Sequence, residues 1–360
     1  MSSSMPLIKR PVTQKHIAEH CNLSLMTVSR ILRKDQEMFK AETVKRVLEA
    51  AEALGYDPSQ TINARRLRYA KDADNTVENK LVAMYFSLHQ AESQYFYRLL
   101  SGISKELYQE GYCLLTNWSS LNNETVGPIP AIFNRGEVDG VLTLSGTPLI
   151  DQVIVKLRSI PGFSTKPIVT MMEQEKDGCC VLVDDRSGGE AAMEHLIDLG
   201  HKEVIHVVFR KWQHQERIAG CEQACKAKGF DPIQVLHPMI SDDQNETPSR
   251  ESLFDTLKRF PTCKAIFSGN DHTAILISQW LKEEGIQVGE DMSLVGFDDT
   301  HSLPDSQGQN MLTTIHIPLE DVARRASRML IERIRNKIPT GEKLTLPVKL
   351  VVRGSATRYQ

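Results

Sequence analysis

The chain has 360 residues, of which 41% are hydrophobic and 25% are charged, and its formal net charge is −3 at pH 7. The length favours more than one folded unit, because a single hydrophobic core stops growing at roughly 250–300 residues. No stretch approaches the ~18 consecutive apolar residues of a membrane helix, and the first residues lack the apolar core of a secretory signal. We therefore expect a cytoplasmic protein without a membrane partner.

The charges are distributed unevenly along the chain. Residues 1–71 carry 13 Lys and Arg against 7 Asp and Glu, whereas the rest of the chain is acidic. A small basic unit on an acidic body predicts that one end of the molecule meets a polyanion. The seven cysteines are scattered without a Cys-x-x-Cys pair, so we expect reduced thiols and no metal held by paired thiolates.

Three short helices are predicted near the N-terminus. Thr13 is the expected N-cap of the first, QKHIAEHC, because its hydroxyl can accept an orphan backbone N–H. Asn22 tolerates the left-handed conformation and makes the turn, and Ser24 caps the second helix, LMTVSRILR. Two helices joined by so tight a turn form a helix-turn-helix unit. The third helix, ETVKRVLEAAEALG, has Gly55 at its C′ position. Its expected buried stripe is Val44, Val47, Leu48, Ala51 and Leu54.

The second helix can enter the major groove of DNA with its first turn against the base edges. Leu25 and Met26 cannot donate hydrogen bonds, so we expect them to contact thymine methyl groups, with Thr27 beside them. Ser29 and Arg30, one turn further on, are better placed for phosphate. The alternative is a three-helix bundle that binds no nucleic acid. With the two capping residues, the predicted DNA-binding set of this segment is Thr13, Ser24, Leu25, Met26, Thr27, Ser29 and Arg30.

One competing motif lies in the first helix. Residues 16–20 spell the His-x-x-Glu-His pattern of inverted zinc peptidases, and His16 and His20 can share a helical face. So small a helix-turn-helix leaves no room for a substrate cleft, and a third ligand is not evident. We therefore interpret both histidines as residues of a polar face.

The motif TVSRILR, followed by VLEAAEALGY, is the most specific feature of this segment. With VTQKHIAEHCNLS before it, it resembles the DNA-binding headpiece of the LacI/GalR family of bacterial regulators. The resemblance implies a dimer on a pseudo-palindromic operator, and a hinge helix that wedges a leucine into the minor groove. The hinge corresponds to ARRLR, with Leu67 as the wedge and Arg65 near phosphate. Two departures are the spacing from Pro58 to Leu67, two residues longer than usual, and Lys40 in place of a capping serine.

The pattern changes after a polar joint. Residues 69–79 lack apolar periodicity, so we assign the headpiece with its hinge to residues 10–69, the linker to 70–79 and the core to 80–360. In the core, short apolar runs such as KLVAMYF, GVLTLS and SLVGFD alternate with helical stretches. Such strands predict parallel sheets covered on both faces, and the length suits two sheets with a cleft between them. The predicted fold class is α/β, with an all-α headpiece.

Polar side chains follow several predicted strands, at the ends where ligands bind in such folds. Asn270 and Asp271 follow AIFSG, and Asp298 and Asp299 follow SLVGF. Arg217 begins a helix after EVIHVVF. A carboxylate, an amide and a guanidinium that converge on a cleft suit a hydroxyl-rich ligand, because each makes two directed hydrogen bonds. Two acidic residues after a strand are, however, more often a loop or a helix cap.

The core carries further signatures of the same family in order, among them VDGVLTLSG, QERIAGCEQA, AIFSGNDHTAI and EDMSLVGFDDT. The resemblance implies a periplasmic-binding-protein-like core of two parallel-sheet lobes, in which Arg217, Asn270 and Asp298 match the polar effector contacts. Tyr95 and Phe96 match an aromatic pair that stacks on the ligand. Trp212 offers a further stacking face or a core contact. Departures that indicate an altered pocket lie at Ser93, Gln94, Met171, Met172, Glu173 and Arg324.

One functional hypothesis and one rival follow. The sequence has no phosphate-loop, dinucleotide-binding or Gly-x-Ser-x-Gly motif, so we expect no enzyme, no catalytic residue and no cofactor. We expect a homodimeric transcription regulator, in the family's terms a repressor, whose affinity for double-stranded operator DNA is set by a sugar-like effector in the cleft. The rival is a small-solute binding protein without a DNA-binding role, against which the basic headpiece argues.

Overall fold

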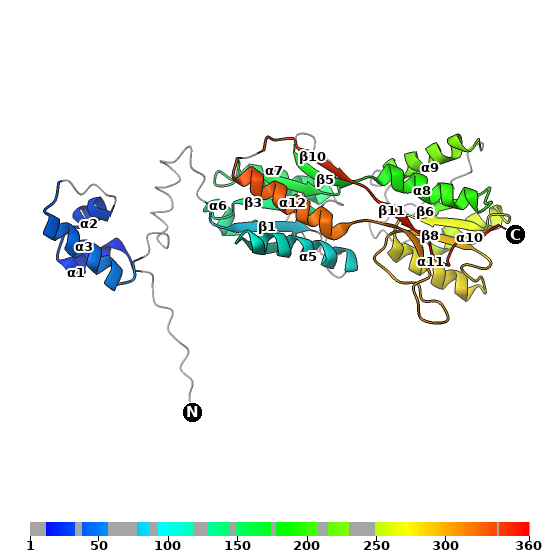
Figure 1. The fold of residues 1–360 in the computed structure, drawn as a ribbon, viewed down its shortest axis with the longest axis horizontal. Helices are drawn as coiled ribbons and strands as arrows, with labels where there is room; N and C mark the ends of the chain where they lie inside the picture. The colour runs from blue at the N-terminus through cyan, green and yellow to red at the C-terminus, as the bar shows by residue number, and fades with distance from the viewer. Residues whose placement is uncertain are drawn as a thin grey trace, which may run out of the picture. The chain divides into compact units, whose positions relative to one another are not determined.

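The computed structural model divides the chain into two compact units, Met1–Val77 and Glu78–Gln360 (Figure 1). Each unit has its own hydrophobic core. The assignment of headpiece, linker and core stays a prediction, because residues 57–77 lie outside the described part of the chain. The structure describes residues 12–32, 38–56, 78–86, 93–118, 128–144, 148–173, 178–207, 215–229, 249–336 and 338–359.

The first unit contains the helices α1 (Gln14–Cys21), α2 (Leu25–Leu32) and α3 (Ala41–Ala53). Asn22 has φ 51° and ψ 47°, so it ends α1 in the left-handed conformation expected from the sequence. Gly55, with φ 67°, follows α3 in a left-handed conformation as well. The helix-turn-helix prediction is therefore confirmed. The buried core of this unit is Ile17, Ala18, Cys21, Val28, Ile31, Val47, Ala50 and Ala51.

The buried stripe of α3 differs from the expected one at a single position. Val47 and Ala51 are buried, and Val44 and Leu54 pack against the core, but Leu48 is 44% exposed. Ala50 is buried in its place. A helix of this period can turn either flank of its stripe inward. The small Ala50 lets α1 and α2 approach more closely than the larger Leu48 would, so the prediction for Leu48 was wrong.

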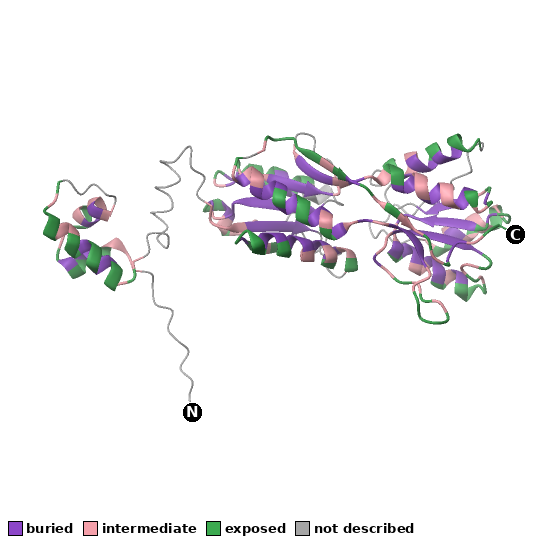
Figure 2. Cartoon of the chain, in the orientation of Figure 1, coloured by how far each residue is buried: buried purple, intermediate pink, exposed green. Residues whose placement is uncertain are grey.

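The second unit consists of two lobes. The first lobe is built around an all-parallel sheet. α5 (Gln94–Gln109) and α12 (Leu319–Ile334) pack on one face of this sheet, and α6 (Ala131–Asn134) and α7 (Pro148–Arg158) pack on the other. Because both faces are covered, the central strands are buried along their length (Figure 2). The strand order is β10 (Lys343–Leu346), β5 (Cys179–Val183), β4 (Ile168–Met171), β3 (Gly140–Leu144), β1 (Leu81–Phe86) and β2 (Cys113–Trp118).

The second lobe is built around another sheet. α8 (Asp185–Asp198) and α9 (Gln215–Ala227) pack on one face, and α10 (Arg250–Arg259) and α11 (Asp271–Glu283) pack on the other. The prediction of two parallel α/β sheets is confirmed except at one edge, where the last strand pairs antiparallel with its neighbour. The strand order is β11 (Lys349–Val351), β9 (Thr313–His316), β8 (Ser293–Asp298), β7 (Ala265–Ser268) and β6 (Ile205–Val207).

The connections between the lobes explain why β11 pairs antiparallel with β9, and they determine where the carboxyl ends of the strands lie. The chain passes from one lobe to the other at residue 184, at residues 317–318 and at residues 347–348. β9 runs towards the first lobe, whereas β11 comes from it, so the two strands are antiparallel. For the same reason the carboxyl ends of the parallel strands in each lobe point towards the other lobe. Loops that follow these strands therefore meet where the lobes face each other.

Helices α8 and α9 approach so closely that two positions require glycine. A Cβ atom on Gly189 would overlap the carbonyl oxygen of Arg217, and one on Gly220 would overlap that of Arg186. We expect Gly189→Ala to destabilise the second unit by about 1–3 kcal/mol, because packed backbones must separate. Urea unfolding measures the loss. Gly354→Ala is the control, since its Cβ would lie 3.7 Å from the nearest side chain, and equal losses in both variants would contradict this explanation.

Candidate functional site

The N-terminal cap of α1 includes His16, which the sequence suggested was only a residue of a polar face. Thr13 lies in extended backbone directly before α1, as an N-cap does. The Thr13 backbone N–H donates to Nδ1 of His16 at 3.0 Å, so the imidazole stands where Glu or Gln completes an ordinary capping box. His20 lies exposed in the last turn, where a basic side chain faces the negative end of the helix dipole. His16 thus closes a helix end rather than merely lining a polar face.

The first turn of α2 presents two large apolar side chains to solvent. Leu25 is 52% exposed and Met26 is 73% exposed, although the opposite face of this helix is buried. Ser24 caps the helix by accepting the Thr27 backbone N–H at 3.0 Å, and its hydroxyl lies 2.8 Å from that of Thr27. The cap therefore fixes Thr27 beside two exposed apolar side chains, at the end of the helix predicted to contact bases.

Ser29 and Arg30 lie half-buried one turn further along α2. Arg30 Nη2 donates to the Met38 sulfur at 3.1 Å, and its guanidinium lies 5.9 Å from the centroid of the Phe39 ring. These contacts hold the arginine against the segment that leads into α3. The remaining predicted residues Arg65, Leu67 and Trp212 lie outside the described residues, so their roles stay predictions.

Arg217 is the centre of a polar cluster at the facing strand ends of the second unit. It is 9% exposed and is held from three directions. Its Nε donates to Asp185 Oδ1 at 2.6 Å, and its Nη1 donates to the Gly269 carbonyl oxygen. Its guanidinium also lies 3.6 Å from the centroid of the Phe297 ring. Asp185 and Gly269 follow β5 and β7, and Phe297 lies near the end of β8, so one arginine joins three strand ends and is already neutralised by Asp185.

Asp298 and Asp299 are adjacent in sequence but have different surroundings. Arg353 Nη2 donates to Asp299 Oδ1 at 2.8 Å, and His316 Nδ1 lies 3.0 Å from Asp299 Oδ2. No described residue donates a hydrogen bond to the Asp298 carboxyl. Burial raises the pKa of Asp298 well above its ordinary value, although the Arg217 guanidinium opposes the rise. Asp298 also has φ 110°, a strained conformation for a residue other than glycine.

Asn270 and Asp271 divide in a similar way. Asp271 is fully buried and accepts the Thr314 hydroxyl at 2.6 Å and the Thr300 backbone N–H at 2.7 Å. Burial raises the pKa of Asp271 to about 6, against the effect of these hydrogen bonds. Asn270 is the N-cap of α11, where its Oδ1 accepts the Thr273 N–H at 2.8 Å. No described residue accepts from the Asn270 amide nitrogen, so in each pair one member keeps hydrogen-bonding capacity for a ligand.

Tyr95 and Phe96 stand in the first turn of α5 but in different surroundings. Burial raises the pKa of the half-buried Tyr95 well above its ordinary value; the Asp298 charge raises it further and the Arg217 charge opposes it. The phenol therefore lies within electrostatic range of the Arg217 cluster. Phe96 is 6% exposed, and its ring centroid lies 4.3 Å from that of Phe86 in the first-lobe core. A stacking role for Phe96 on a ligand thus stays a prediction.

Asp185 is the cluster residue that the sequence analysis missed. It begins α8, directly after the N-cap Asp184, whose carboxylate accepts the Ser187 N–H at 3.0 Å. A signal was present, because Asp185 follows the apolar strand CVLV as the other candidates follow theirs. Its partner Arg217 lies 32 residues further along the chain, however, and only the fold brings the two together.

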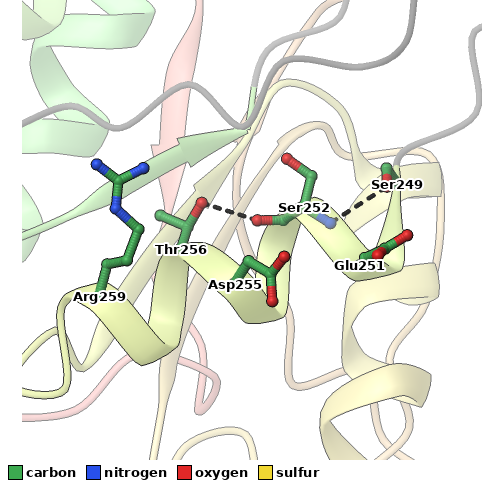
Figure 3. A pocket seen from close by; sticks show the side chains of 6 residues that line it. All are labelled: Ser249, Glu251, Ser252, Asp255, Thr256 and Arg259. Atoms are coloured by element: carbon green, nitrogen blue, oxygen red, sulfur yellow. Dashed lines mark hydrogen bonds between the residues drawn. The ribbon is translucent and has the colours of Figure 1, made fainter.

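A surface hollow along α10 is unrelated to this cluster (Figure 3). Its lining side chains belong to α10 and its N-cap, and two hydrogen bonds join them along the helix: Ser252 N–H to Ser249 Oγ at 3.2 Å and Thr256 Oγ1 to the Ser252 carbonyl oxygen at 2.7 Å. No predicted effector residue lines it, so we assign it no function. The lining residues are Ser249, Glu251, Ser252, Asp255, Thr256 and Arg259.

Comparison with protein families places both units. The family of bacterial regulatory proteins named after lacI matches residues 13–59, which contain the helix-turn-helix unit. A periplasmic binding protein-like domain matches residues 193–356, which contain Arg217, Asn270 and Asp298. The chain thus carries the helix-turn-helix domain of the LacI family of bacterial regulatory proteins, followed by a periplasmic binding protein-like domain. It is therefore a DNA-binding transcriptional regulator with a small-molecule effector site in its core, and not an enzyme. The rival interpretation as a solute-binding protein without a DNA-binding role is set aside.

Two relatives of this chain are repressors, and each matches it along nearly its whole length. The HTH-type transcriptional repressor PurR of Haemophilus influenzae (strain ATCC 51907 / DSM 11121 / KW20 / Rd) is 28% identical over 352 residues, which cover 95% of this chain and 98% of that repressor. The ribose operon repressor of Escherichia coli (strain K12) is 26% identical over 349 residues, which cover 96% and 99%.

Solved structures of LacI-family regulators share the fold. The complex of the transcriptional regulator CelR with cellobiose has a TM-score of 0.63 at 22% identity, covering 96% of this chain and 100% of that one. The lac repressor dimer bound to operator and the anti-inducer ONPF has a TM-score of 0.60 at 20% identity, covering 97% and 100%. At these identities the likeness shows the fold alone. In the ranges that the structure describes, no helix is long and apolar enough to cross a membrane.

Proposed function

We propose that this regulator is a cytoplasmic, homodimeric repressor whose operator affinity is set by an uncharged, hydroxyl-rich effector. The proposed effector contacts are Tyr95, Arg217, Asn270 and Asp298, with Phe96 beside them. The direction of the response, release or tightening of the operator, is an outcome of the experiment below.

The Arg217–Asp185 ion pair beside Asp298 is the observation that carries the proposed effector class. Asp185 already neutralises Arg217, so the site offers no surplus positive charge to an anionic ligand. A sugar hydroxyl can donate to the Asp298 carboxylate and accept from the Asn270 amide and from the remaining Arg217 N–H groups. The ribose operon repressor among the relatives and the cellobiose complex among the similar structures support a sugar.

The headpiece supplies the proposed operator contacts. Exposed apolar side chains at the first turn of α2 suit thymine methyl groups, so we assign base contact to Leu25 and Met26. The polar side chains of the headpiece suit phosphate and sugar oxygens. Half-sites in such dimers lie about one helical turn apart, near 34–36 Å. Thr27 is assigned to the same base-facing turn. The assigned phosphate-side residues are Thr13, Ser24, Ser29, Arg30 and Arg65, with Leu67 as the minor-groove wedge.

Affinity selection of sheared genomic DNA on the full-length protein tests this proposal. The selection is run alone, with D-ribose and cellobiose, and with the anionic pair ribose 5-phosphate and gluconate. Enrichment of a pseudo-palindrome that changes with the neutral pool is the expected result. A response to the anionic pool alone would contradict the proposed effector class, and no enriched sequence at low salt would contradict operator binding.

Arg30→Ala is expected to weaken binding to all DNA sequences alike and to reduce the slope of log K against log salt by about one unit, since one phosphate contact is lost. Fluorescence anisotropy at several salt concentrations measures both quantities. Lys45→Ala is the matched control, because Lys45 pairs with Glu49 on α3. An unchanged slope for Arg30→Ala would place this side chain away from phosphate.

A further inference from the structure

The second unit begins at an ion cluster that contains none of the proposed effector contacts. Arg335 Nε donates to Glu78 Oε1 at 3.2 Å, and Arg335 Nη1 lies 3.0 Å from Glu110 Oε2. Glu78 is the first residue of this unit, and the chain before it leads to the headpiece. We call this group of three side chains the linker clasp. Its side chains are only 20–40% exposed, so the charges attract one another more strongly than a fully solvated pair does.

The clasp joins two helix ends to the start of the core. Glu110 is the C-cap of α5 and Arg335 is the C-cap of α12, so the guanidinium offsets the negative ends of both helix dipoles. Lys80 makes a second ion pair with Glu78 and has φ 60°, and its ammonium lies 4.3 Å from the centroid of the Tyr112 ring. Burial opposes ionisation of Glu78, but hydrogen bonds, led by that from Lys80, hold its pKa below the ordinary value.

Helix α12 connects the clasp to the lobe crossing next to the effector site. The Ile317 N–H, in the crossing that leads into α12, lies 3.5 Å from the Asp298 carbonyl oxygen. α12 then runs for 16 residues, about 24 Å, to Arg335. Near its start it lies so close to α5 that a Cβ on Gly102 would overlap the Glu320 carbonyl oxygen. A helix held at one end transmits a small tilt there as a larger displacement at the other, about 2 Å for 5° over this length.

We propose that the linker clasp is the point at which α12 passes the state of the effector site to the chain segment that carries the headpiece. Ligand at Asp298 shifts the crossing at residue 317, α12 tilts together with α5 on the sheet of the first lobe, and Arg335 moves the carboxylate of Glu78 with it. The device rests on the proposed function, because it presupposes that an effector changes operator affinity.

Other ion pairs between α5 and α12 show why the clasp is more than a helix fastening. Lys105 Nζ lies 3.2 Å from Glu320 Oε2, and Arg328 Nη2 lies 2.8 Å from the buried Glu106 Oε1. These pairs already hold the two helices together along their length. The bond from Arg335 to Glu78 adds nothing to that purpose, but it ties α12 to the residue at which the core begins.

Two variants of nearly identical chemistry separate the two arms of the clasp. Glu78→Gln weakens the bond to the start of the core, whereas Glu110→Gln weakens only the bond between the two helix ends. For the full-length wild type and both variants, fluorescence anisotropy gives the operator Kd with and without saturating D-ribose or cellobiose, whichever alters the wild type. Calorimetry gives the Kd of that sugar, and thermal unfolding checks the fold.

Glu78→Gln is expected to reduce the sugar-dependent change in operator Kd by about 2- to 30-fold. Its sugar Kd and its unfolding midpoint should stay near those of the wild type, and Glu110→Gln should keep the full change. Equal responses of Glu78→Gln and the wild type would overturn the clasp, as would equal losses in both variants, which point to helix fastening alone. A wild type whose operator Kd changes with neither sugar would instead overturn the proposed sugar effector, and the clasp with it.

Discussion

Replacing Asp298 by Asn is expected to lower the affinity for the effector about 10- to 150-fold, roughly 1.5–3 kcal/mol, while operator binding without effector stays unchanged. A ligand hydroxyl that donates to a carboxylate loses a charge-assisted bond, and one Asn nitrogen now presents N–H groups to it. Stability should not fall. Burial raises the pKa of Asp298, so its ionised form disfavours the folded state near neutral pH, and a neutral amide removes that cost.

Asp299→Asn is the matched control, because the same substitution one residue later removes a carboxylate with internal partners. Arg353 and His316 both contact Asp299, so we expect a loss of stability of about 1 kcal/mol or more. Calorimetry with the responsive sugar and urea unfolding separate the two effects. If Asp298→Asn binds the effector as tightly as the wild type, Asp298 is not a ligand contact.

Local chemistry made the headpiece predictable from its sequence. A capping serine, a left-handed Asn22 and a C′ Gly55 each act within one helical turn, so the three helices follow from near neighbours. The wrong prediction for Leu48 shows what local chemistry does not determine. Which flank of α3 is buried depends on how closely the other helices approach, and Ala50 and Leu48 are equally compatible with the helical period.

The core shows the same boundary at its functional residues. The residue types and their places after strands predicted where polar side chains gather. They did not predict which residue of the pair Asn270 and Asp271, or of the pair Asp298 and Asp299, keeps hydrogen-bonding capacity for a ligand. The difference within each pair arises from hydrogen-bond partners that lie far away in the sequence, such as Thr314 for Asp271 and Arg353 for Asp299. The resemblance to the LacI family chose the members that the structure leaves without full internal partners. Neither the residue pattern nor the family resemblance named Asp185, because its role depends on the approach of Arg217 from another helix.

Replacing Arg217 by Met is expected to have the largest effect on folding, a loss of about 3–5 kcal/mol, because it leaves carboxylates buried without their counter-charge. Arg217 is 9% exposed and contacts Asp185, Gly269 and Phe297 at once. Effector binding should be lost in parallel. Arg217→Lys should recover part of the stability, since it restores the charge. It should not recover full affinity, because an ammonium cannot bond to Asp185 and Gly269 in the fork geometry of a guanidinium.

The double variant Asp185→Asn, Arg217→Met decides whether the loss arises from the unpaired charge. With Asp185 neutral, the double variant should be more stable than Arg217→Met alone, so the two single losses should not add. Urea unfolding of the wild type, both single variants and the double variant measures the coupling. Additive losses would mean that Arg217 stabilises the lobe by packing on Phe297 rather than by its charge. The Asp185 pair would then leave the guanidinium available to an anion, and the argument for an uncharged effector would fail.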